Sequence, residues 1–283
     1  MTDDPTTLVS TDWLAARLTA PDLRIIDASW YLPDMHRDPL EEYGQRHIPG
    51  ARFLPLDEIS DARSVLPHMA PPVEKFMSRM RRMGVGDGHT IVLYDGAGLF
   101  SAARVWWLMR LFGQKAAVLD GGLPKWLAEN YPVTSDLPQI RDRHMTVTRH
   151  PELMRDVTDV AQAAKLGHAQ IVDARGAPRF RGDEPEPRAG LRAGHIPGAR
   201  NVPYKTVFNA DGTMKRGIHL RAAFEEAGVD LTRPIITSCG SGVTAAILNL
   251  GLTILGHDDH SLYDGSWAEW GMYPDLKIET GDA

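Results

Sequence analysis

The amino-acid sequence contains one long internal repeat, and this repeat limits the possible folds more than any other feature. Three motifs occur twice, in the same order and at an offset of about 145 residues. They are His-Ile-Pro-Gly-Ala-Arg at 47–52 and 195–200, an apolar segment ending in Asp-Ala at 25–28 and 171–174, and an Asp-Gly segment ending in Trp at 120–126 and 264–270. Such an ordered set is hard to obtain by chance, so we predict two homologous copies in tandem.

Each copy has the size of a domain. A copy spans about 110–130 residues, which is too long for a solenoid repeat and typical of an independently folded unit. We therefore predict an N-terminal domain over 1–133, a linker rich in charges and turns over 134–151, and a C-terminal domain over 152–283. The alternative is a single domain with two similar loops, and it requires the ordered match to be a coincidence.

Within each copy, short apolar segments rich in β-branched residues end at Asp or Gly, as buried parallel strands do. These segments are 23–28, 90–94 and 116–119 in the first copy, and 169–173, 234–238 and 260–263 in the second. Segments with helical spacing of apolar residues, such as 73–83, lie between them. Strands that alternate with helices predict an α/β domain with a mostly parallel sheet in each copy.

Composition and charge exclude several classes of partner. The chain of 283 residues is 43% hydrophobic and 24% charged, and its net charge is −6, so no general basic field favours nucleic acid or an anionic membrane. The first residues are acidic and lack the pattern of a signal peptide. The most apolar segments, 105–113 and 245–256, fall short of the roughly 20 residues that span a bilayer. We expect a cytoplasmic protein that binds neither nucleic acid nor membrane.

The single cysteine, Cys239, lies where a strand turns into a helix. One cysteine excludes an internal disulfide and a thiolate zinc site, and we expect no metal and no cofactor; the cluster at 257–260 is predicted to be a surface turn. A helix N-terminus after 239–244 would favour the reactive thiolate. The loop amides, at Gly240, Gly242, Val243 and Thr244, could then face one anionic centre. The alternative is an inert buried thiol.

The first copy has no such nucleophile. At the same offset as the other motifs, the position equivalent to Cys239 holds Asp95. A carboxylate cannot act as a thiolate nucleophile, so the N-terminal copy is predicted to be catalytically inactive and to act as scaffold. His47 and His195 occur in both copies although only one has a cysteine, so we expect them to stabilise turns. Trp106 and Trp107 are expected in the core.

Together these motifs resemble the two-domain rhodanese (sulfurtransferase) superfamily. The tandem Asp-Ala strands, the His-Ile-Pro-Gly-Ala motifs, the Asp-Gly segments ending in Trp and a cysteine in the second copy only carry this resemblance, which covers nearly the whole chain. It implies a five-stranded, mostly parallel sheet flanked by helices in each domain, with the site in the cleft between domains. The N-terminal domain would then serve as a second wall of the site.

The cysteine loop points to one branch of this family. Its sequence, Cys-Gly-Ser-Gly-Val-Thr at 239–244, is similar to the loop of 3-mercaptopyruvate sulfurtransferases. Thiosulfate:cyanide sulfurtransferases usually carry basic side chains at the two places that Gly240 and Ser241 occupy here. The segments 27–33 and 179–188 also resemble the mercaptopyruvate branch.

The resemblance also implies roles for side chains outside the loop. It assigns Arg179 and Arg188 to the substrate, and the planar guanidinium suits a carboxylate next to a ketone. Arg181 and Arg192 are treated as bystanders. A proposed Ser-His-Asp proton relay in the family matches Ser241, His68 and Asp57, of which the last two lie in the first copy.

The expected activity is transfer of sulfur from 3-mercaptopyruvate, through a Cys239 persulfide, to cyanide or to a thiol such as reduced thioredoxin, with release of pyruvate. Two steps through a covalent intermediate predict ping-pong kinetics. A thiosulfate:cyanide sulfurtransferase and a non-enzymatic persulfide relay are the alternatives. A cysteine phosphatase is disfavoured because position 245, where that class has a phosphate-binding arginine, is Ala245.

Overall fold

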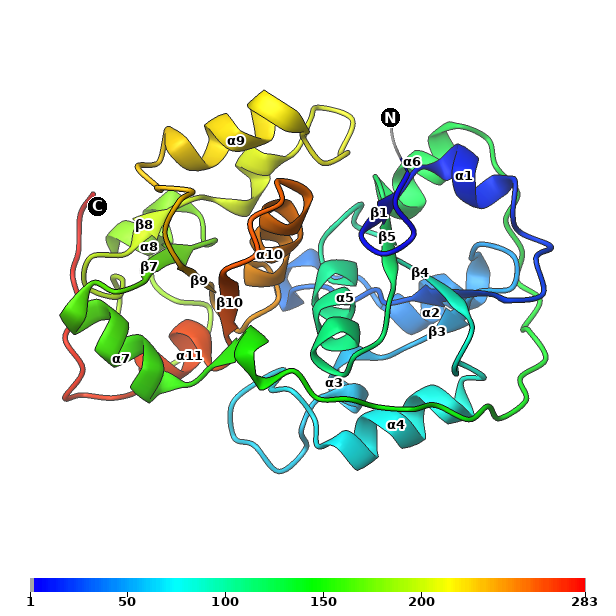
Figure 1. Ribbon diagram of the computed structural model, residues 1–283, viewed down its shortest axis with the longest axis horizontal. Coiled ribbons are helices and arrows are strands. Elements are labelled where there is room, and N and C mark those ends of the chain that lie inside the picture. The colour runs from blue at the N-terminus through cyan, green and yellow to red at the C-terminus, as the bar shows by residue number, and fades with distance from the viewer. Residues whose placement is uncertain (1–2, 283) are drawn as a thin grey trace. The chain divides into compact units, whose positions relative to one another are not determined.

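The computed structural model describes residues 3–282, which form two compact units (Figure 1). The first unit contains the residues up to Ala62, Ala70–His150 and Asn209–Thr213. The second contains Arg63–Met69, Pro151–Phe208 and the residues from Met214 onward. The short segment 63–69 thus packs with the second unit although it lies in the first sequence copy, a point that matters for the site.

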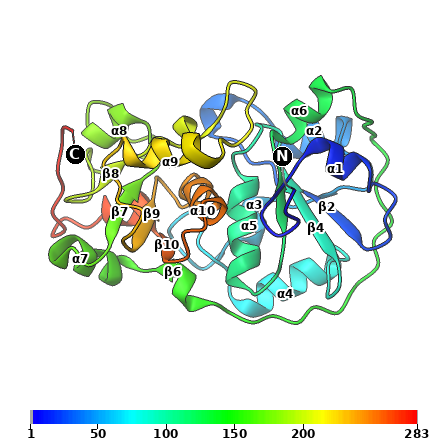
Figure 2. The same ribbon diagram turned by 45° about the horizontal axis from the view of Figure 1, so that its top comes forward.

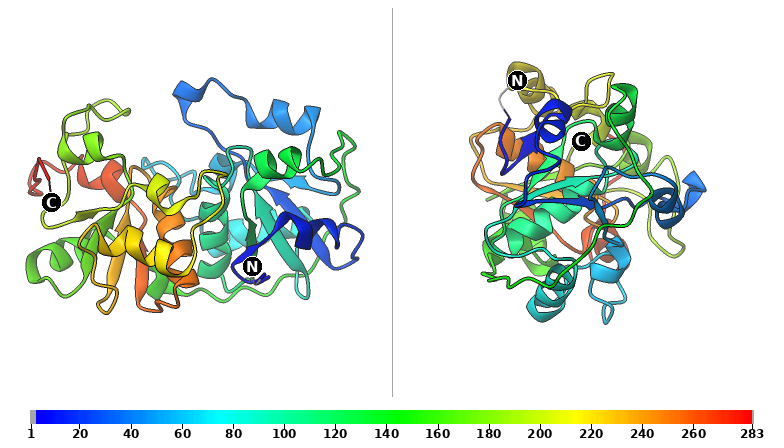
Figure 3. Two further views of the ribbon diagram at one scale, coloured as in Figure 1. Left: turned by 90° about the horizontal axis from the view of Figure 1, so that it is seen from above. Right: turned by 90° about the vertical axis from the view of Figure 1, so that its right-hand side faces the viewer.

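The first unit alternates short strands with helices. Its strands are β1 (Leu8–Val9), β2 (Leu23–Asp27), β3 (Arg52–Phe53), β4 (Thr90–Tyr94) and β5 (Ala117–Leu119). Its helices are α1 (Thr11–Ala15), the 3₁₀ turn η1 (Pro33–Met35), α2 (Pro39–Gln45), α3 (Leu56–Ile59), α4 (Val73–Arg82), α5 (Ala102–Leu111) and α6 (Gly122–Ala128). The left view of Figure 3 shows the blue segment with η1 and α2 projecting from the strands of this unit.

The second unit repeats this order of elements. Its strands are β6 (Met154–Arg155), β7 (Gln170–Asp173), β8 (Arg200–Asn201), β9 (Ile235–Ser238) and β10 (His260–Tyr263). Its helices are η2 (Pro151–Leu153), α7 (Val157–Leu166), α8 (Ala177–Arg181), η3 (Tyr204–Val207), α9 (Gly217–Glu225), α10 (Ala245–Ile254) and α11 (Ser266–Trp270).

Each unit is built on a five-stranded sheet in which all neighbouring strands are parallel. The strand orders are β1-β5-β4-β2-β3 and β6-β10-β9-β7-β8, which are the same order in the two copies. Helix α5 packs on β4 and β5, and α10 packs in the equivalent place on β9 and β10 (Figure 2). Parallel strands require such crossover helices, and the predicted α/β fold with a five-stranded parallel sheet in each copy is confirmed.

The central strands were predicted to within a residue, but the edge strands were not. The central strands β2, β4, β7, β9 and β10 are buried nearly throughout, as their apolar sequences require. The edge strands β1, β3, β6 and β8 have two residues each and leave no periodic pattern in the sequence. Within residues 3–282, no helix is long and apolar enough to cross a membrane.

The core of each unit lies between its sheet and its helices. In the first unit, Trp106 and Trp107 lie in the middle of α5 and are fully buried, in agreement with their predicted place in the core. In the second, Trp267 and Trp270 of α11 pack with Phe180 and Tyr263. These large side chains fix α11 against the sheet, and α11 in turn contacts the cysteine loop.

Candidate active site

Cys239 lies at the carboxyl end of the central strand β9, in a loop that leads to the first residue of α10. Its side chain is only 2% exposed. The loop is fixed to α11 because the N–H groups of Trp267 and Ala268 donate to the carbonyl oxygens of Cys239 and Gly240 at 2.9 and 2.8 Å. The N–H of Cys239 donates to Oγ of Ser266 at 3.2 Å. The thiol therefore has a defined position at the helix N-terminus, where negative charge is stabilised.

The backbone amides of the loop are available to an anion. In the described part of the chain, no N–H group of residues 240–244 donates to a protein carbonyl or side chain. Gly242 has a φ of 79°, a conformation that glycine adopts at little cost and that lets the loop turn back on itself. Successive amides that face one side of a loop form a concavity suited to an anion.

The equivalent loop of the first unit shows the same geometry filled by a side chain. The carboxylate of Asp95 follows β4 as Cys239 follows β9, and it accepts the N–H groups of Ala97, Phe100 and Ala102 at 2.9, 2.7 and 2.9 Å. Burial raises the pKa of Asp95, although these amides act in the opposite direction. A carboxylate thus occupies in the first copy the place where an anionic sulfur would lie in the second.

The two predicted substrate arginines lie over the cysteine loop. A Cβ atom added to Gly240 would lie 3.2 Å from Nη2 of Arg179 and 3.9 Å from Nη1 of Arg188. Arg179 belongs to α8, and Arg188 to the segment that follows this helix. The absence of a side chain at Gly240, the residue next to Cys239, therefore makes room for two guanidinium groups. A donor with a carboxylate could bind there in a bidentate manner.

The histidine and the serine of the predicted relay are in contact. Nδ1 of His68 lies 2.9 Å from Oγ of Ser241, and both side chains are buried. His68 has a φ of 60°, which is uncommon for a residue other than glycine and is often found at functional sites. Because 63–69 packs with the second unit, a residue of the first sequence copy reaches the cysteine loop.

Asp57, the third residue of the predicted relay, belongs to the other unit. It lies in α3 and its Oδ2 accepts a hydrogen bond from Nε1 of Trp30 at 3.3 Å. Trp30 in turn stacks on Phe100 with ring centroids 6.3 Å apart. Its role as the relay carboxylate stays a prediction.

The two repeated histidines have structural contacts, as expected. Nδ1 of His47 lies 2.8 Å from the carbonyl oxygen of Tyr43, and Nδ1 of His195 lies 2.9 Å from that of Phe180. Each ring also stacks on the aromatic side chain of the same partner. Both histidines therefore hold a turn against a helix. Within residues 3–282, no group of three or more His, Cys, Asp or Glu side chains could hold a metal ion.

A family model described as the rhodanese-like domain matches residues 10–129 and 156–273. The chain belongs to the rhodanese family. It is 43% identical over 276 residues to the 3-mercaptopyruvate sulfurtransferase of Escherichia coli strain K12, covering 97% of this chain and 98% of that protein. It is also 43% identical over 295 residues to the mitochondrial thiosulfate/3-mercaptopyruvate sulfurtransferase 1 of Arabidopsis thaliana, covering 96% and 78%.

The fold comparison agrees with the sequence comparison. The crystal structure of SseA, a 3-mercaptopyruvate sulfotransferase from Escherichia coli, superposes with a TM-score of 0.85 at 41% identity, covering 93% of this chain and all of that one. The predicted membership in the rhodanese family is therefore confirmed.

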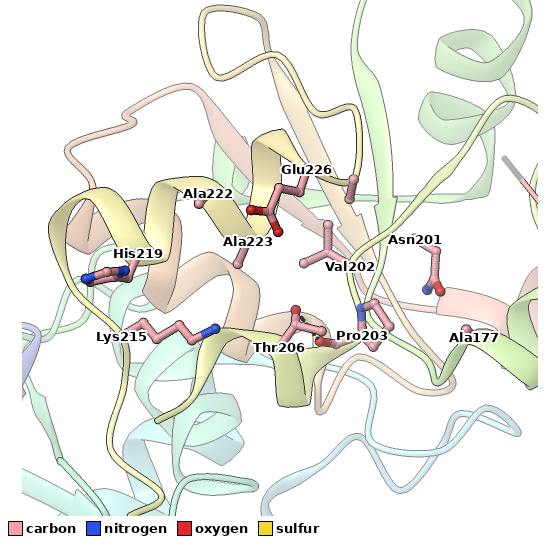
Figure 4. A pocket seen from close by; sticks show the side chains of 11 residues that line it. Ala177, Asn201, Val202, Pro203, Thr206, Lys215, His219, Ala222, Ala223 and Glu226 are labelled. Carbon is pink, nitrogen blue, oxygen red and sulfur yellow. Dashed lines mark hydrogen bonds between the residues drawn. The ribbon is translucent and has the colours of Figure 1, made fainter. Parts of the chain in front are cut away.

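Two of the cavities in the second unit of this rhodanese chain differ in their relation to the candidate site. One of about 280 Å³ adjoins the candidate site and is lined by Val65, Leu66, Pro67, Arg188 and neighbouring apolar residues. The other, of about 490 Å³, lies between α9, η3 and β8, with Lys215, His219 and Glu226 around it (Figure 4). None of the residues predicted to act on substrate lines this second cavity.

One buried acidic residue near the two arginines, Glu186, was not predicted from the sequence. Glu186 lies between the two arginines in the sequence, and its side chain is 2% exposed and bound to Arg179. The two bystander arginines are engaged elsewhere, Arg181 with Asp183 and Arg192 with backbone carbonyls such as that of Leu276. A glutamate inside a motif with several arginines was the available signal, but the sequence does not say which arginine it binds.

Proposed function

We propose that this rhodanese-family chain is a 3-mercaptopyruvate sulfurtransferase. The observation that carries the proposal is the pair of guanidinium groups, from Arg179 and Arg188, over Gly240 and beside Cys239. 3-Mercaptopyruvate offers a carboxylate and a ketone to such groups, and each charge-assisted contact contributes about 1.5–3 kcal/mol. The names of the relatives, which act on 3-mercaptopyruvate or on both donors, support the same substrate class.

The first half of the reaction loads sulfur onto the enzyme. The thiolate of Cys239 attacks the sulfur of 3-mercaptopyruvate, the carbon–sulfur bond breaks, and its electron pair leaves on the enolate of pyruvate. Ser241 and His68 convey the proton that turns the enolate into pyruvate, consistent with their contact at 2.9 Å. The outer sulfur of the persulfide is anionic, and the amides of Gly240, Gly242, Val243 and Thr244 stabilise it.

The second half unloads the sulfur. A thiolate, such as that of reduced thioredoxin, or cyanide attacks the outer sulfur, the sulfur–sulfur bond breaks, and Cys239 returns to its thiolate form. A double displacement of this kind gives parallel lines in double-reciprocal plots. We further propose a cytoplasmic location and a catalytically inactive N-terminal domain, in which Asp95 replaces the cysteine.

The decisive experiment compares kcat/KM for 3-mercaptopyruvate and for thiosulfate, with cyanide as acceptor, in the wild type and in Cys239→Ser. We expect a large preference for 3-mercaptopyruvate and loss of turnover in the variant. A preference for thiosulfate would still be consistent with Cys239 as the nucleophile, but it would make thiosulfate the sulfur donor. Turnover that survives in Cys239→Ser would contradict the mechanism, and failure of both donors to load Cys239 would favour a relay protein.

The arginine assignment has a matched control within the same motif. Arg188→Lys replaces a planar fork with a point charge and should lower kcat/KM for 3-mercaptopyruvate by about tenfold or more. Arg181→Lys changes a partly exposed arginine that binds Asp183 and should have little effect. Equal values for the two variants would remove Arg188 from the substrate site. Asp57→Asn tests the relay in the same assay, through a lower kcat.

A further inference from the structure

Glu186 connects the candidate substrate arginine Arg179 to a rigid ion-pair network. Its Oε1 accepts from Nη1 of Arg175 at 2.7 Å and from Nε of Arg179 at 3.3 Å, while Oε2 accepts from Nη2 of Arg179 at 2.5 Å. The Glu186 side chain is 2% exposed, whereas that of Arg179 is 23% exposed. One buried carboxylate thus holds the edge of a guanidinium whose other edge is accessible.

Arg175 makes this carboxylate immobile. Its side chain is 1% exposed and binds both oxygens of Asp173, at 2.7 to 3.2 Å, and the carbonyl oxygen of Gly194 at 2.8 Å. Its guanidinium lies 4.4 Å from the centre of the Trp267 ring. Burial acts to lower the pKa of Arg175, but the carboxylates of Asp173 and Glu186 outweigh it and raise the pKa. Arg175 is therefore a fixed cation that orients Glu186.

The contacts of Glu186 determine which part of Arg179 faces the nucleophile. Nε and one N–H of Nη2 point to the carboxylate, which leaves Nη1 and the second N–H of Nη2 for a ligand. Nη2 is also the atom nearest to the space above Gly240, 3.2 Å from an added Cβ. Two hydrogen bonds that Arg179 donates to one carboxylate fix the plane of its guanidinium. The Arg179 fork is thus set in place before a substrate arrives.

Glu186 also changes the charge that a donor meets. The carboxylate of Glu186 offsets the positive charge of the Arg179 guanidinium, but the guanidinium keeps its N–H groups in fixed directions for a substrate. Coulomb energy scales with the charge of the ligand, so each unit of positive charge in the site attracts thiosulfate, a dianion, about twice as strongly as a monocarboxylate. A site with less positive charge and well-aligned donors therefore favours the monocarboxylate.

We propose that Glu186 is a positioning and specificity-determining residue, which fixes the Arg179 fork and selects a singly charged α-keto carboxylate donor over the thiosulfate dianion. The selectivity part rests on the proposed sulfurtransferase function. The effect of the Glu186 charge on the site does not rest on that function, because it applies to any anion that approaches Cys239.

The kinetic test uses Glu186→Gln, which keeps the shape of the side chain and removes its charge. We expect kcat/KM for 3-mercaptopyruvate to fall, mainly through KM, and the ratio of kcat/KM for 3-mercaptopyruvate to that for thiosulfate to fall by about tenfold. Asp183→Asn is the matched control, because Asp183 is an exposed carboxylate of the same segment that binds Arg181. A loss of equal size for both donors would reduce Glu186 to a structural role.

Alkylation of Cys239 gives a readout that needs no turnover. Cys239 is the only cysteine, so its reaction rates with iodoacetate, a monocarboxylate, and with neutral iodoacetamide can be measured directly. Glu186→Gln should raise the ratio of the iodoacetate rate to the iodoacetamide rate several-fold, and Asp183→Asn should leave it unchanged. An unchanged ratio in folded Glu186→Gln would overturn the charge proposal. If the wild type lacked turnover with 3-mercaptopyruvate, the proposed function would be contradicted. The alkylation ratio would still test the effect of the Glu186 charge.

Glu186→Asp separates position from charge and also serves if Glu186→Gln does not fold. Aspartate retains the charge but is one methylene shorter, so it cannot bind Arg175 and Arg179 together as glutamate does. We expect the alkylation ratio to stay at the wild-type value while kcat/KM for 3-mercaptopyruvate falls. Wild-type kcat/KM in Glu186→Asp would contradict the positioning role.

Discussion

Asp27 and Asp173 end equivalent strands, β2 and β7, but their surroundings differ in charge. Asp173 is paired with Arg175, two residues later in the sequence. At the equivalent place the first copy has Ser29, which donates to Asp27 through its N–H at 2.9 Å and through its hydroxyl. Burial raises the pKa of Asp27 to about 6, although the hydrogen bonds from Ser29 act in the opposite direction. A serine therefore takes in the first copy the place of the arginine that pairs with the equivalent aspartate in the second.

This difference predicts a pH-dependent stability. The folded state binds the Asp27 proton more tightly than the unfolded state, so the carboxyl favours folding most below its ordinary pKa, and this contribution is lost as the pH rises through about 6. The contribution of Asp27 to the free energy of unfolding that is lost over this pH range is about 3 kcal/mol. The free energy of unfolding in urea should thus fall between pH 4.5 and 7 more in the wild type than in Asp27→Asn. Asp258→Asn, at an exposed position, is the control; a difference independent of pH would contradict this interpretation.

At Gly240, the lack of a side chain leaves room for the guanidinium of Arg179. A Cβ atom there would approach Nη2 of Arg179 to 3.2 Å, which is closer than ordinary van der Waals contact. Gly240→Ala should displace the guanidinium and lower kcat/KM for 3-mercaptopyruvate by about tenfold. Gly44→Ala, in α2 with no atom within 4 Å of the added Cβ, should leave it unchanged. Full activity in Gly240→Ala would show that Arg179 can move without consequence.

At the scale of elements, two helices of the second unit differ in how they begin. Helix α7 has a capping box, in which the side chain of Asp156 accepts the N–H of Asp159 at 3.0 Å and the N–H of Asp156 donates to Asp159 at 3.2 Å. Helix α10, which follows the cysteine loop, has no side-chain cap on its N-terminal N–H groups. A cap would compete with an anion for these donors, so its absence suits a helix that serves a site.

The capping box gives a prediction at this scale. Asp156→Ala removes an acceptor from the first turn of α7 and should lower the free energy of unfolding by about 1 kcal/mol. Thr158→Ala, in the same turn and exposed, is the control. Urea denaturation measures both, and turnover should not change in either variant because α7 contributes no predicted site residue. Equal stability of Asp156→Ala and the wild type would show that water replaces the cap.

At the scale of the whole molecule, one cysteine serves two homologous units. The loop of the first unit has the amide geometry but holds the carboxylate of Asp95, whereas the second holds Cys239. The two units therefore share the fold, whereas only the second has the cysteine that we propose as the nucleophile. The segment 63–69 brings His68, a residue of the first sequence copy, into contact with Ser241 of the cysteine loop.

This arrangement predicts the stoichiometry of sulfur loading. Treatment with excess 3-mercaptopyruvate without an acceptor should add one sulfur atom to each chain, on Cys239, because a carboxylate cannot accept sulfur. Intact-protein mass spectrometry measures the gain, and cyanide should reverse it. Cys239→Ser should gain no sulfur. Loading that persists in this variant would require a second site and contradict the assignment.

The sequence by itself determined the features that consecutive residues encode. The tandem copies, the central strands and the cysteine loop between β9 and α10 follow from repetition, from apolar periodicity and from glycines at a turn, all of which are local. The edge strands did not follow, because two residues are too few to form a pattern and depend on pairing with a neighbour.

Only the tertiary structure decided which distant side chains meet. His68 and Ser241 are separated by 173 positions in the sequence, and packing of 63–69 with the second unit brings them together. The family resemblance indicated Arg179 and Arg188 as substrate-binding residues. Their place over Gly240, and the contact of Arg179 with Glu186, depend on how α8 packs on the sheet. Local sequence sets backbone conformation, whereas contacts between remote side chains depend on the free energy of packing the whole unit.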